Sequence, residues 1–375
     1  MKTRRILFVS HVLNLSGAPR SLFYLLKSLP RLPGWEYWVL GLRQTDLRKA
    51  FEEVVDRVEV ISPKAPESLP AKALERIFSL PKIFDFLRRA EPDLVFVNSA
   101  ANSRVITLAR FLGYRIWVYV HEFDEGFVLF SSLRRKALLF AEKVFVTNSQ
   151  QLSWVRDKVG FKGEIRILPN ILPEVPDQIS SPKKSFLEFR KRFPFLVATV
   201  GFLNKLKGWD YLLKLIKTLR NDKEIGFVLI GDFLNPKEKK AFYKALTEAG
   251  LHARFYLTGI VEEVWPYLRR VDCVAITSRS ETFSRAAMEA LACGVPVVAF
   301  KVGSLAEVFP KGYPFLIEPF AVDSFGEKIL EIKNFSPEKK KAFQRTIKSH
   351  LQQFLPDRVA TQFQEELKKA FGTKA

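Results

Sequence analysis

Two glutamates in the segment SRSETFSRAAMEALACG (278–294) have the types and spacing to bind a polar ligand. Glu281 lies in a polar stretch with turn-forming residues, whereas Glu289 lies inside the apolar helical run 286–293. Burial of a carboxylate costs free energy unless the group is paired or hydrogen-bonded. Glu289 therefore either stands at a helix edge for structural reasons or accepts hydrogen bonds from a polar molecule that docks against it.

The order of elements around these glutamates predicts an anion-binding site. The run 272–278 has the pattern of a strand, and a helix is expected to begin at Phe283 or Ser284. Backbone N–H groups at Phe283, Ser284 and Arg285 would face an anion, and the helix dipole would strengthen its binding. A carboxylate such as that of Glu289 accepts well from two neighbouring hydroxyls, for example those of a ribose. The alternative is a helix-edge glutamate that binds no ligand.

Other candidate residues follow predicted strands in the first half of the chain. His121 ends the strand 116–121, and although a lone histidine is more often structural, strand ends are where α/β sheets bind ligands. Gly17 would allow close approach of the backbone to a phosphate, and the alternative is an ordinary turn before a helix. Asn98 and Asn148 also end strands, where they could meet hydroxyl groups of a ligand.

Short apolar runs alternate with amphipathic helical patterns along the chain, which indicates parallel sheets covered by helices on both faces. The expected strands are 5–10, 37–42, 58–62, 93–99, 116–121, 143–149, 165–170, 195–201, 225–232, 254–259, 272–278 and 296–300. The segment 169–185 has four prolines and no periodicity, as is typical of a linker. We therefore expect an α/β chain of two Rossmann-like, doubly wound domains that face each other across a cleft, which is the default ligand site.

The expected domain boundaries follow from this change of pattern. The first domain comprises residues 1–170, the linker 171–194 and the second domain 195–350, and residues 351–375 form a closing segment. The tail reads as two basic amphipathic helices that are broken near Pro356.

The net charge of +20 is distributed over both halves of the chain. It favours an anionic partner such as a nucleotide, a phospholipid surface or a nucleic acid, and solubility alone is the alternative. The segments 126–143 and 183–193 mix aromatic and basic residues, which suits an anionic membrane surface. The alternative for each segment is a core-facing helix with a solvated basic face. No apolar run approaches the length that spans a membrane, so we expect a cytoplasmic protein, peripheral on the inner face of the membrane.

At Glu281 and Glu289 the chain resembles the glycosyl transferases group 1 family, whose retaining members carry the signature E-x7-E. Other segments fall in the order of that family. VGFLNKLKGWDYLL (200–213) resembles its VGRLxxxKGxDxLL motif, FVLIGD (227–232) its VGDG segment, YLTGIV (256–261) the segment near the nucleotide base, HVLNLSGAPRSLFYLLKSL (11–29) the first loop and helix, VHEF (120–123) a recurring histidine site, and PDRVATQFQEELKKAF (356–371) the helix that returns to the first domain. The resemblance covers nearly the whole chain.

This resemblance implies a GT-B architecture and a nucleotide-diphosphate sugar, UDP- or GDP-linked, held mainly by the second domain. It implies catalytic roles for Lys207 at the diphosphate, Glu281 at the transferred sugar, and His121 at the sugar or the leaving phosphate. The donor-binding residues that it implies are Gly17, Lys205, Asp232, Ile260, Val261, Thr282, Phe283, Ser284, Arg285 and Glu289. A fixed lysine and a helix N-terminus would stabilise the leaving phosphate, so neither a metal nor another cofactor is expected. For Asp232 the alternative is a turn cap.

The chain departs from the family pattern at two places. Phe202 stands where the family usually has arginine, and Lys205 or Arg285 could supply the missing charge. Lysine offers a point charge where arginine offers a planar fork. The family's EGFG is Glu281-Thr-Phe-Ser here, which restricts the backbone beside the sugar. Both departures bear on activity and on the identity of the donor.

The resemblance therefore implies a retaining, metal-independent hexosyltransferase, and we expect it to act on a glycan or lipid-linked acceptor in cell-envelope polysaccharide synthesis. The first alternative is a nucleotide-sugar epimerase of GT-B fold. The second is a catalytically impaired GT-B protein that only binds, for which Phe202 is the best argument. No nucleic-acid motif is present, so nucleic acid is not an expected partner. The sugar, the base, the acceptor and the oligomeric state have no readable signal.

Overall fold

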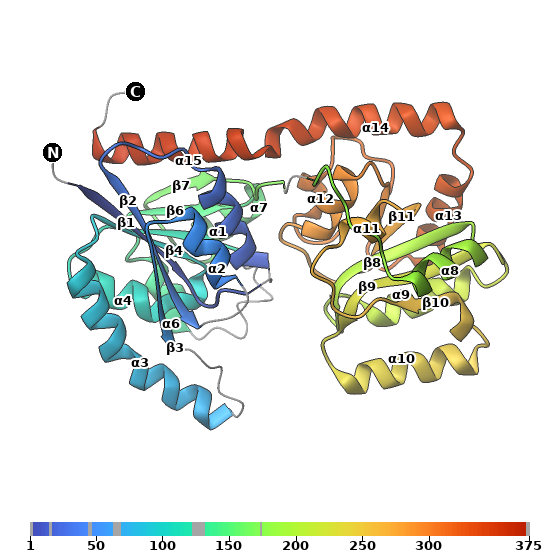
Figure 1. The fold of residues 1–375 in the computed structure, drawn as a ribbon, viewed down its shortest axis with the longest axis horizontal. Coiled ribbons are helices and arrows are strands. Elements are labelled where there is room, and N and C mark those ends of the chain that lie inside the picture. Colours follow the sequence, from blue (N-terminus) through green and yellow to red (C-terminus); the bar gives the residue numbers. More distant parts are fainter. Residues whose placement is uncertain are drawn as a thin grey trace. The chain divides into compact units, whose positions relative to one another are not determined.

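The structure is a computed structural model that describes residues 3–14, 17–43, 47–62, 69–121, 132–172 and 175–372, without the side chains of 69–76 and 132–134. The chain divides into two compact units. Unit 1 comprises residues 1–171 and 354–375, and unit 2 comprises residues 172–353. Both are α/β units whose helices and strands alternate along the chain (Figure 1).

Unit 1 contains a parallel sheet of seven described strands in the order β3-β2-β1-β4-β5-β6-β7. The chain winds outward from β1 in one direction and from β4 in the other, so the sheet is doubly wound. Its strands are β1 (Arg4–Ser10), β2 (Trp35–Arg43), β3 (Arg57–Ser62), β4 (Leu94–Asn98), β5 (Ile116–Val120), β6 (Lys143–Val146) and β7 (Glu164–Ile167). Its helices are α1 (Gly17–Ser28), α2 (Arg48–Val54), α3 (Leu69–Ala90), α4 (Ser103–Phe111), α6 (Ser132–Leu138), α7 (Ser149–Asp157) and α15 (Pro356–Phe371).

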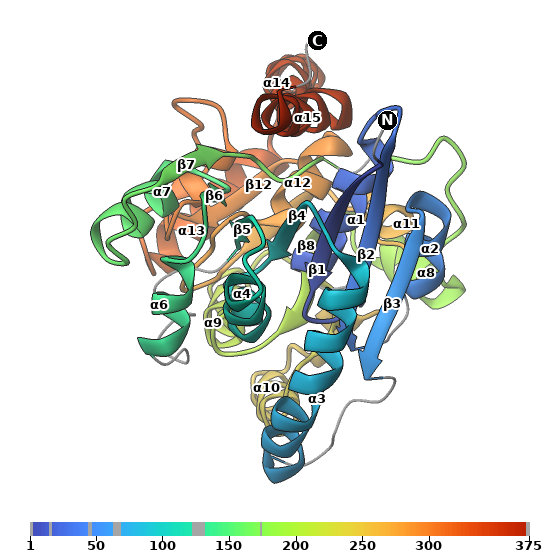
Figure 2. The same ribbon diagram turned by 90° about the vertical axis from the view of Figure 1, so that its left-hand side faces the viewer.

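Two apolar clusters cover the two faces of this sheet, as the uninterrupted apolar strands predict. One cluster joins the sheet to α3, α4, α6 and α7. The other joins it to α1, α2 and α15, and Phe363 of α15 is fully buried there among the rings of Phe8, Phe96 and Phe145. In Figure 2 the ribbon is turned by 90° about the vertical axis, so that the side of unit 1 faces the viewer. The last helix of the chain is thus part of the first core.

Unit 2 repeats the architecture with six described strands in the order β10-β9-β8-β11-β12-β13, all parallel. The strands are β8 (Phe195–Leu203), β9 (Ile225–Phe233), β10 (Phe255–Leu257), β11 (Cys273–Ile276), β12 (Val297–Phe300) and β13 (Leu316–Ile317). The helices are α8 (Lys184–Arg192), α9 (Trp209–Thr218), α10 (Pro236–Glu248), α11 (Trp265–Leu268), α12 (Arg285–Ala292), α13 (Val322–Lys333) and α14 (Pro337–Leu351). The switch of direction lies between β8 and β11, whose carboxyl ends carry most of the predicted site residues.

The segment expected as a linker is only partly irregular. Residues 184–192 form helix α8, and both of its phenylalanines, Phe186 and Phe189, are buried. Lys184, Lys191 and Arg192 are exposed, whereas Arg190 is half-buried against Asp272. Helix α8 is therefore a core-facing helix with a basic outer side. The other segment expected at a membrane, 126–143, lies partly outside the described residues.

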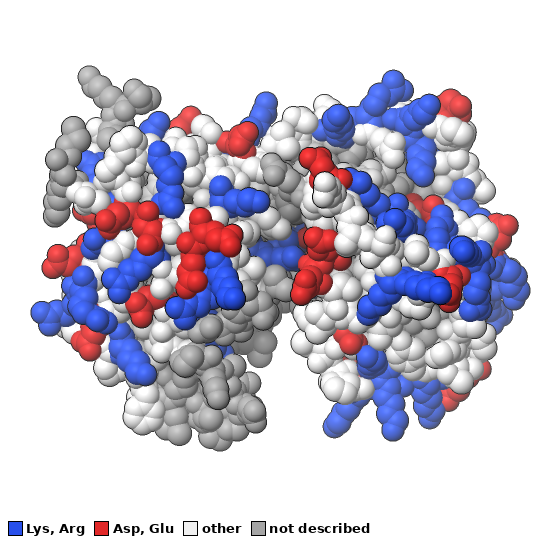
Figure 3. All heavy atoms as spheres, in the orientation of Figure 1, with Lys and Arg blue, Asp and Glu red and all other residues white. Residues whose placement is uncertain are grey.

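Charged residues are distributed over both units, in agreement with the charge of the two halves of the sequence. Figure 3 shows lysines and arginines across each unit on one face, with acidic residues between them. Within the part of the chain that the structure describes, no helix is both long and apolar enough to cross a membrane.

Candidate functional site

Lys207 and Glu281, which are 74 residues apart in the sequence, meet at the carboxyl edge of the sheet of unit 2. The Nζ of Lys207 lies 2.6 Å from Oε1 of Glu281, and the hydroxyl of Ser278 donates to the same oxygen at 2.7 Å. Glu281 is buried at 8% exposure, whereas the side chain of Lys207 is 41% exposed. The structure thus places a solvent-accessible cation over a buried carboxylate.

A close backbone contact holds these two loops together. Gly208 has a φ of +72°, and a Cβ atom on it would lie 1.9 Å from the carbonyl oxygen of Thr277. The hydroxyl of Thr277 also donates to the carbonyl oxygens of Lys207 and Gly208, at 3.2 Å and 3.1 Å. Only glycine fits at this position, because any side chain would separate the start of α9 from the end of β11.

A third loop supports the backbone beside Glu281. Gly303 has a φ of +53°, and a Cβ atom there would lie 2.2 Å from the carbonyl oxygen of Glu281. The amide of Ser304 donates to that oxygen at 3.1 Å, and its hydroxyl donates to the carbonyl of Thr282 at 2.5 Å. Sequence reasoning did not single out Gly303 or Ser304, although a glycine soon after a buried strand, β12, was an available signal.

Glu289 lies on the buried side of α12 at 5% exposure, and Arg285 compensates its charge. The guanidinium of Arg285 lies one turn earlier and contacts Oε1 of Glu289 at 2.8 Å. An i,i+4 pair of opposite charges is favourable on a helix, and pairing removes much of the cost of burial. The carboxylate is therefore buried in a charged pair rather than displaced to a helix edge.

Helix α12 begins at Arg285, one residue later than the later of the two predicted starts, Phe283 and Ser284. Ser284 is the N-cap residue, and its hydroxyl accepts from the amide of Ala287 at 3.4 Å. Helix α12 starts at Arg285, so the residues Thr282, Phe283 and Ser284 form the loop that leads into its first turn. The helix dipole, and first-turn amides that have no partner within the helix itself, favour an anion at this end.

Asp210 organises the other cations at this edge. Arg279 contacts the Asp210 carboxylate with both terminal nitrogens, at 2.8 Å and 2.7 Å, and Lys205 contacts it at 2.9 Å. Burial alone would raise the pKa of Asp210, but the hydrogen bonds from Arg279 and Lys205 outweigh it and hold that pKa well below its usual range. Sequence reasoning missed Arg279 and Asp210. The predicted donor-binding residue Lys205 is part of this cluster, because it pairs with Asp210.

Phe202 is half exposed, at 50%, near the carboxyl end of β8, where it lies opposite Asp232 of the neighbouring strand β9. Asp232 pairs with Lys239 at 2.8 Å and accepts from the amide of Phe233 at 2.7 Å, so it caps the strand end. Ile260 is among the most exposed apolar residues of unit 2, and Val261 beside it is half-buried.

In unit 1, His121 joins a buried polar cluster at the carboxyl ends of β4 and β5. Its Nε2 lies 2.6 Å from Oδ1 of Asn98, whose amide nitrogen donates to the carbonyl of Ala18 in α1 at 2.9 Å. Burial, with a smaller contribution from His11, lowers the pKa of His121 to about 3. The imidazole is therefore neutral near pH 7 and donates its Nε2 proton to Asn98.

The other predicted residues of unit 1, Gly17 and Asn148, lie at the amino ends of helices. Gly17 is the first residue of α1, and the space around it would accept a Cβ atom, so no close approach requires glycine there. Asn148 is the N-cap of α7 and accepts from the amide of Gln151 at 2.9 Å. Glu122 and Phe123 of the histidine segment lie outside the described residues.

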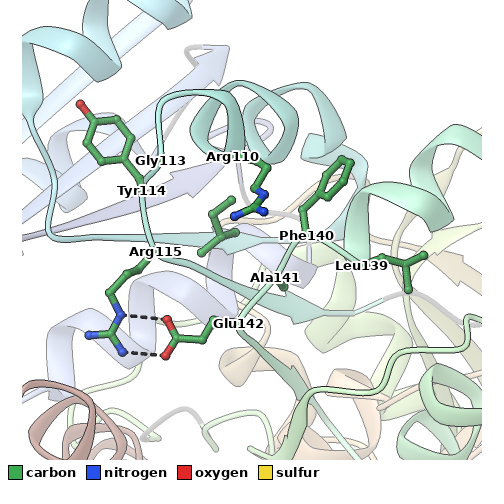
Figure 4. A pocket seen from close by; sticks show the side chains of 9 residues that line it. Arg110, Gly113, Tyr114, Arg115, Leu139, Phe140, Ala141 and Glu142 are labelled. Atoms are coloured by element: carbon green, nitrogen blue, oxygen red, sulfur yellow. Dashed lines mark hydrogen bonds and ion pairs between the residues drawn. The ribbon is translucent and has the colours of Figure 1, made fainter.

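A pocket of about 400 Å³ lies at the opposite, amino edge of the sheet of unit 1 (Figure 4). It contains none of the predicted site residues. Its lining comprises Arg110, Gly113, Tyr114, Arg115, Ile116, Leu139, Phe140, Ala141 and Glu142. Among the side chains that the structure describes, no group of three or more His, Cys, Asp or Glu residues could hold a metal ion.

Two family models match consecutive parts of this chain. The model described as Glycosyltransferase Family 4 matches residues 15–173, and the model described as Glycosyl transferases group 1 matches residues 183–350. The second match contains both glutamates of the opening segment, Lys207 and the whole sheet of unit 2.

The chain belongs to the glycosyl transferases group 1 family.

Individual members of the family share part of their length with this chain. An uncharacterised glycosyltransferase, MJ1178, of Methanocaldococcus jannaschii is 34% identical over 137 residues, which is 36% of this chain and 37% of that protein. The D-inositol 3-phosphate glycosyltransferase of Segniliparus rotundus is 30% identical over 172 residues, which is 42% of this chain and 36% of that protein. The chain therefore matches little more than a third of the length of either relative.

The fold extends beyond these local matches. The crystal structure of Anabaena Alr3699/HepE in complex with UDP and glucose superposes with a TM-score of 0.77 over 98% of this chain and 100% of the other, at 21% identity. The two parallel-sheet units thus have the GT-B architecture that the resemblance predicts. The family models confirm the group 1 membership, and the superposition confirms the GT-B fold.

Proposed function

We propose that the chain transfers a hexosyl group from a UDP- or GDP-linked sugar to a glycan or lipid-linked acceptor, with retention of configuration. The observation that carries this proposal is the pairing of Lys207 with buried Glu281 beside the amino end of α12. Those three features can bind a sugar hydroxyl and a diphosphate at one sheet edge. The likeness to Alr3699/HepE, which was crystallised in complex with UDP and glucose, supports the same donor class.

In this proposal the donor separates the ion pair of Lys207 and Glu281 and binds to both side chains. Lys207 neutralises Glu281 in the absence of donor, and its exposed side chain can turn to the diphosphate when the donor binds. Glu281, still held by Ser278, then accepts hydrogen bonds from sugar hydroxyls. Negative charge grows on the leaving phosphate as the glycosidic bond breaks, so a cation at that place stabilises the transition state more than the ground state.

The remaining donor contacts follow from the geometry of α12. The first-turn amides after Ser284 would bind a phosphate, and Glu289 would accept from ribose hydroxyls while Arg285 holds its carboxylate in place. His121 of unit 1 has in this proposal the role of a neutral donor to the sugar or the leaving phosphate, for which its single Nε2 proton would turn from Asn98 to the ligand. Because lysine and helix dipole supply the positive charge, we propose that the reaction needs no divalent cation.

The acceptor and the location are further parts of the proposal. We propose a role in cell-envelope polysaccharide synthesis, on the cytoplasmic side, with the chain bound peripherally to the inner face of the membrane. The net charge of +20 supports association with anionic lipid.

A second candidate is a GT-B protein that binds a nucleotide sugar without transferring the sugar. Phe202 is apolar and half exposed where the family usually has arginine, and both Lys205 and Arg279 are held by Asp210. If Lys207 and α12 do not supply enough positive charge, cleavage would be slow although binding persists.

Turnover of UDP- and GDP-sugars in the presence of EDTA distinguishes the two candidates. We expect proton NMR to show loss of the donor and a product with the anomeric configuration of the donor. Lys207→Ala should lower the rate by about 10²- to 10³-fold, as expected for loss of a group that stabilises transition-state charge. The exposed Lys217→Ala on α9 is the matched control and should keep the wild-type rate. Tight nucleotide binding without any turnover would support the binding-only candidate.

A further inference from the structure

Helix α10 begins at the same sheet edge as the candidate site and carries a lysine that sequence reasoning did not single out. Lys239 is the fourth residue of α10, and its Nζ lies 2.8 Å from Oδ1 of Asp232 at the end of β9. The same oxygen accepts from the amide of Phe233 at 2.7 Å. Burial alone would raise the pKa of Asp232, but the hydrogen bonds from Lys239 and Phe233 outweigh it and lower that pKa, so the carboxylate is ionised near pH 7.

The strand register places this ion pair beside the end of β8. Asp232 lies directly opposite Phe202 in the pairing of β9 with β8, and Phe202 is apolar and half exposed, so it supplies no charge there. In the sheet, β8 has β9 on one side and β11 on the other. Lys207 reaches Glu281 in the loop after β11, whereas Lys239 stands at β9. Cations therefore lie on both sides of the end of β8.

Helix packing also brings Lys239 toward the loop that carries Lys207. Helices α9 and α10 lie side by side against the sheet (Figure 1). Phe242 follows Lys239 by three residues and therefore lies on the same side of α10. Its ring lies 6.5 Å from that of Trp209, the first residue of α9, and 5.2 Å from that of Phe233. The beginnings of both helices and the end of β9 thus form one packed group.

A nucleotide-diphosphate sugar presents more negative charge than Lys207 alone neutralises. Both of its phosphates are ionised near pH 7. When the bond between the sugar and the diphosphate breaks, its electron pair stays on the phosphate oxygen, so the negative charge grows further in the transition state. A second fixed cation at the diphosphate would stabilise that charge more than it stabilises the bound donor.

Lys239 is more easily released to such a ligand than Lys205. Lys205 would have to leave both the carboxylate of Asp210, at 2.9 Å, and the ring of Trp209, whose centre lies 5.7 Å away. Among the described residues, Asp232 is the only ion-pair partner of Lys239. The side chain of Asp232 is 27% exposed, so water can hydrate the carboxylate after Lys239 has turned away.

We infer that Lys239 is a second cation for the diphosphate of the donor, held by Asp232 until the donor binds. On binding, Nζ of Lys239 turns from the carboxylate of Asp232 to a phosphate oxygen. The inference rests on the proposed function, because that function places the diphosphate at the edge where Lys207 lies. Asp232 then competes with the donor for Lys239, so removal of the cation and removal of the carboxylate have opposite effects on donor binding.

Calorimetric titration of UDP and GDP in EDTA tests these opposite effects. Lys239→Met keeps a long stem without the charge and should weaken nucleotide binding by about tenfold or more, as expected for loss of a charged hydrogen bond. Asp232→Asn keeps an acceptor for the amide of Phe233 and should strengthen binding by about two- to fivefold, the order of an exposed ion pair. Lys237→Met, at an exposed lysine of the same helix, is the matched control and should keep the wild-type affinity.

Rescue by a second cation separates a binding role from a structural one. Lys239→Met should also lower kcat for the donor sugar by about tenfold, and Phe202→Arg in the same chain should restore most of the loss, because residue 202 lies opposite Asp232. Urea unfolding checks that each variant is folded. Weaker binding in both Lys239→Met and Asp232→Asn, without rescue by Phe202→Arg, would show a structural ion pair and overturn the inference.

The same titrations keep the inference apart from the proposed function. Wild-type affinity and turnover in Lys239→Met would overturn the inference alone. Nucleotide binding that depends on Lys239, in a chain that turns over no sugar donor, would support the inference and contradict sugar transfer. Absence of UDP and GDP binding by the wild type would overturn both.

Discussion

At the scale of single residues, the candidate site is a set of charges that neutralise one another before any ligand arrives. Lys207 pairs with Glu281, Arg285 pairs with Glu289, and Lys239 pairs with Asp232. A paired site avoids the cost of isolated buried charge. Because each cation is already paired, an anionic donor must displace a carboxylate from its cation. The site therefore selects ligands that offer an anion to the cation and hydrogen-bond donors to the carboxylate.

His121 allows a prediction about pH at the same scale. Because its pKa is lowered to about 3, its charge does not change above pH 5. The substitution His121→Asn should therefore lower the rate of sugar transfer by about tenfold or more without moving the acid limb of the pH–rate profile, which reports groups that titrate. A shift of that limb in the variant would show that His121 titrates during the reaction.

The glycine before α9 allows a prediction about stability. Gly208→Ala should destabilise unit 2 by about 2 kcal/mol or more, because a left-handed φ and a clash with the carbonyl of Thr277 add together. Gly250→Ala is the control, since its φ is also positive, at +68°, but nothing lies near its missing Cβ. Urea unfolding measures both. Equal losses would mean that the contact between Gly208 and Thr277 contributes nothing.

At the scale of elements, the loops that follow β8 and β11 are joined by the Asp210 cluster. Arg279 reaches from the second loop to Asp210 on α9 and also donates to the carbonyl of Lys205 at 2.6 Å. Its guanidinium carbon lies 4.4 Å from the ring centre of Tyr211. The cluster therefore fixes the two loops that present Lys207 and Glu281.

Asp210→Asn tests this link through its pH dependence. The folded pKa of Asp210 lies below the ordinary value of 3.8, so its contribution is present above that pH and is lost as the pH falls toward the folded pKa. We expect the variant to be less stable by about 2 kcal/mol at pH 7, the order of a charged hydrogen bond. The difference between wild type and variant should shrink below pH 3.8. A difference that is constant with pH would contradict a charge-based link.

The elements were largely predictable because their hydrophobic patterns are strong. Uninterrupted apolar runs located each strand in the described residues except β13, which has only two residues, Leu316 and Ile317. Helix α8 was not predicted, because the prolines before it made the whole segment resemble a linker. Pro81 lies inside α3 without ending it. Short or proline-marked elements are decided by packing that a local pattern does not contain.

The site was predictable in its residues but not in its pairs. Spacing along one helix located Glu289, but its partner Arg285 was assigned only to the phosphate. Lys207 and Glu281 come from loops 74 residues apart, and their contact depends on how β8 lies beside β11. Arg279 looked like an ordinary loop residue because nothing in the sequence shows that it reaches Asp210.

At the scale of the whole molecule, the two ends of the chain form one unit. Helix α15 packs on the sheet of unit 1, and Glu366 pairs there with buried Lys143. Gln364 donates to the carbonyl of Pro30 at 3.2 Å. The last helix therefore completes the first core, and the stability of unit 1 depends on the end of the chain.

Phe363→Ala measures that dependence. The side chain is fully buried among four aromatic residues, so its loss should cost about 3–5 kcal/mol of unfolding free energy. Phe111→Ala, at a phenylalanine that is 79% exposed, should cost less than about 0.5 kcal/mol. Guanidinium unfolding followed by tryptophan fluorescence reports on Trp117 of the same core. A small effect at Phe363 would mean that α15 is not part of the cooperative unit.

The central claim is that unit 2 binds the nucleotide of a sugar donor through α12 and its neighbouring loops. Calorimetric titration of UDP, GDP and ADP in EDTA tests it most directly, on the wild type, on Glu289→Ala and on the exposed control Glu327→Ala. We predict selective binding of UDP or GDP by the wild type and the control, and binding at least about tenfold weaker in Glu289→Ala, as expected for loss of a charged hydrogen bond. Absence of binding to all three nucleotides, or affinity unchanged in Glu289→Ala, would contradict the assignment of the donor site.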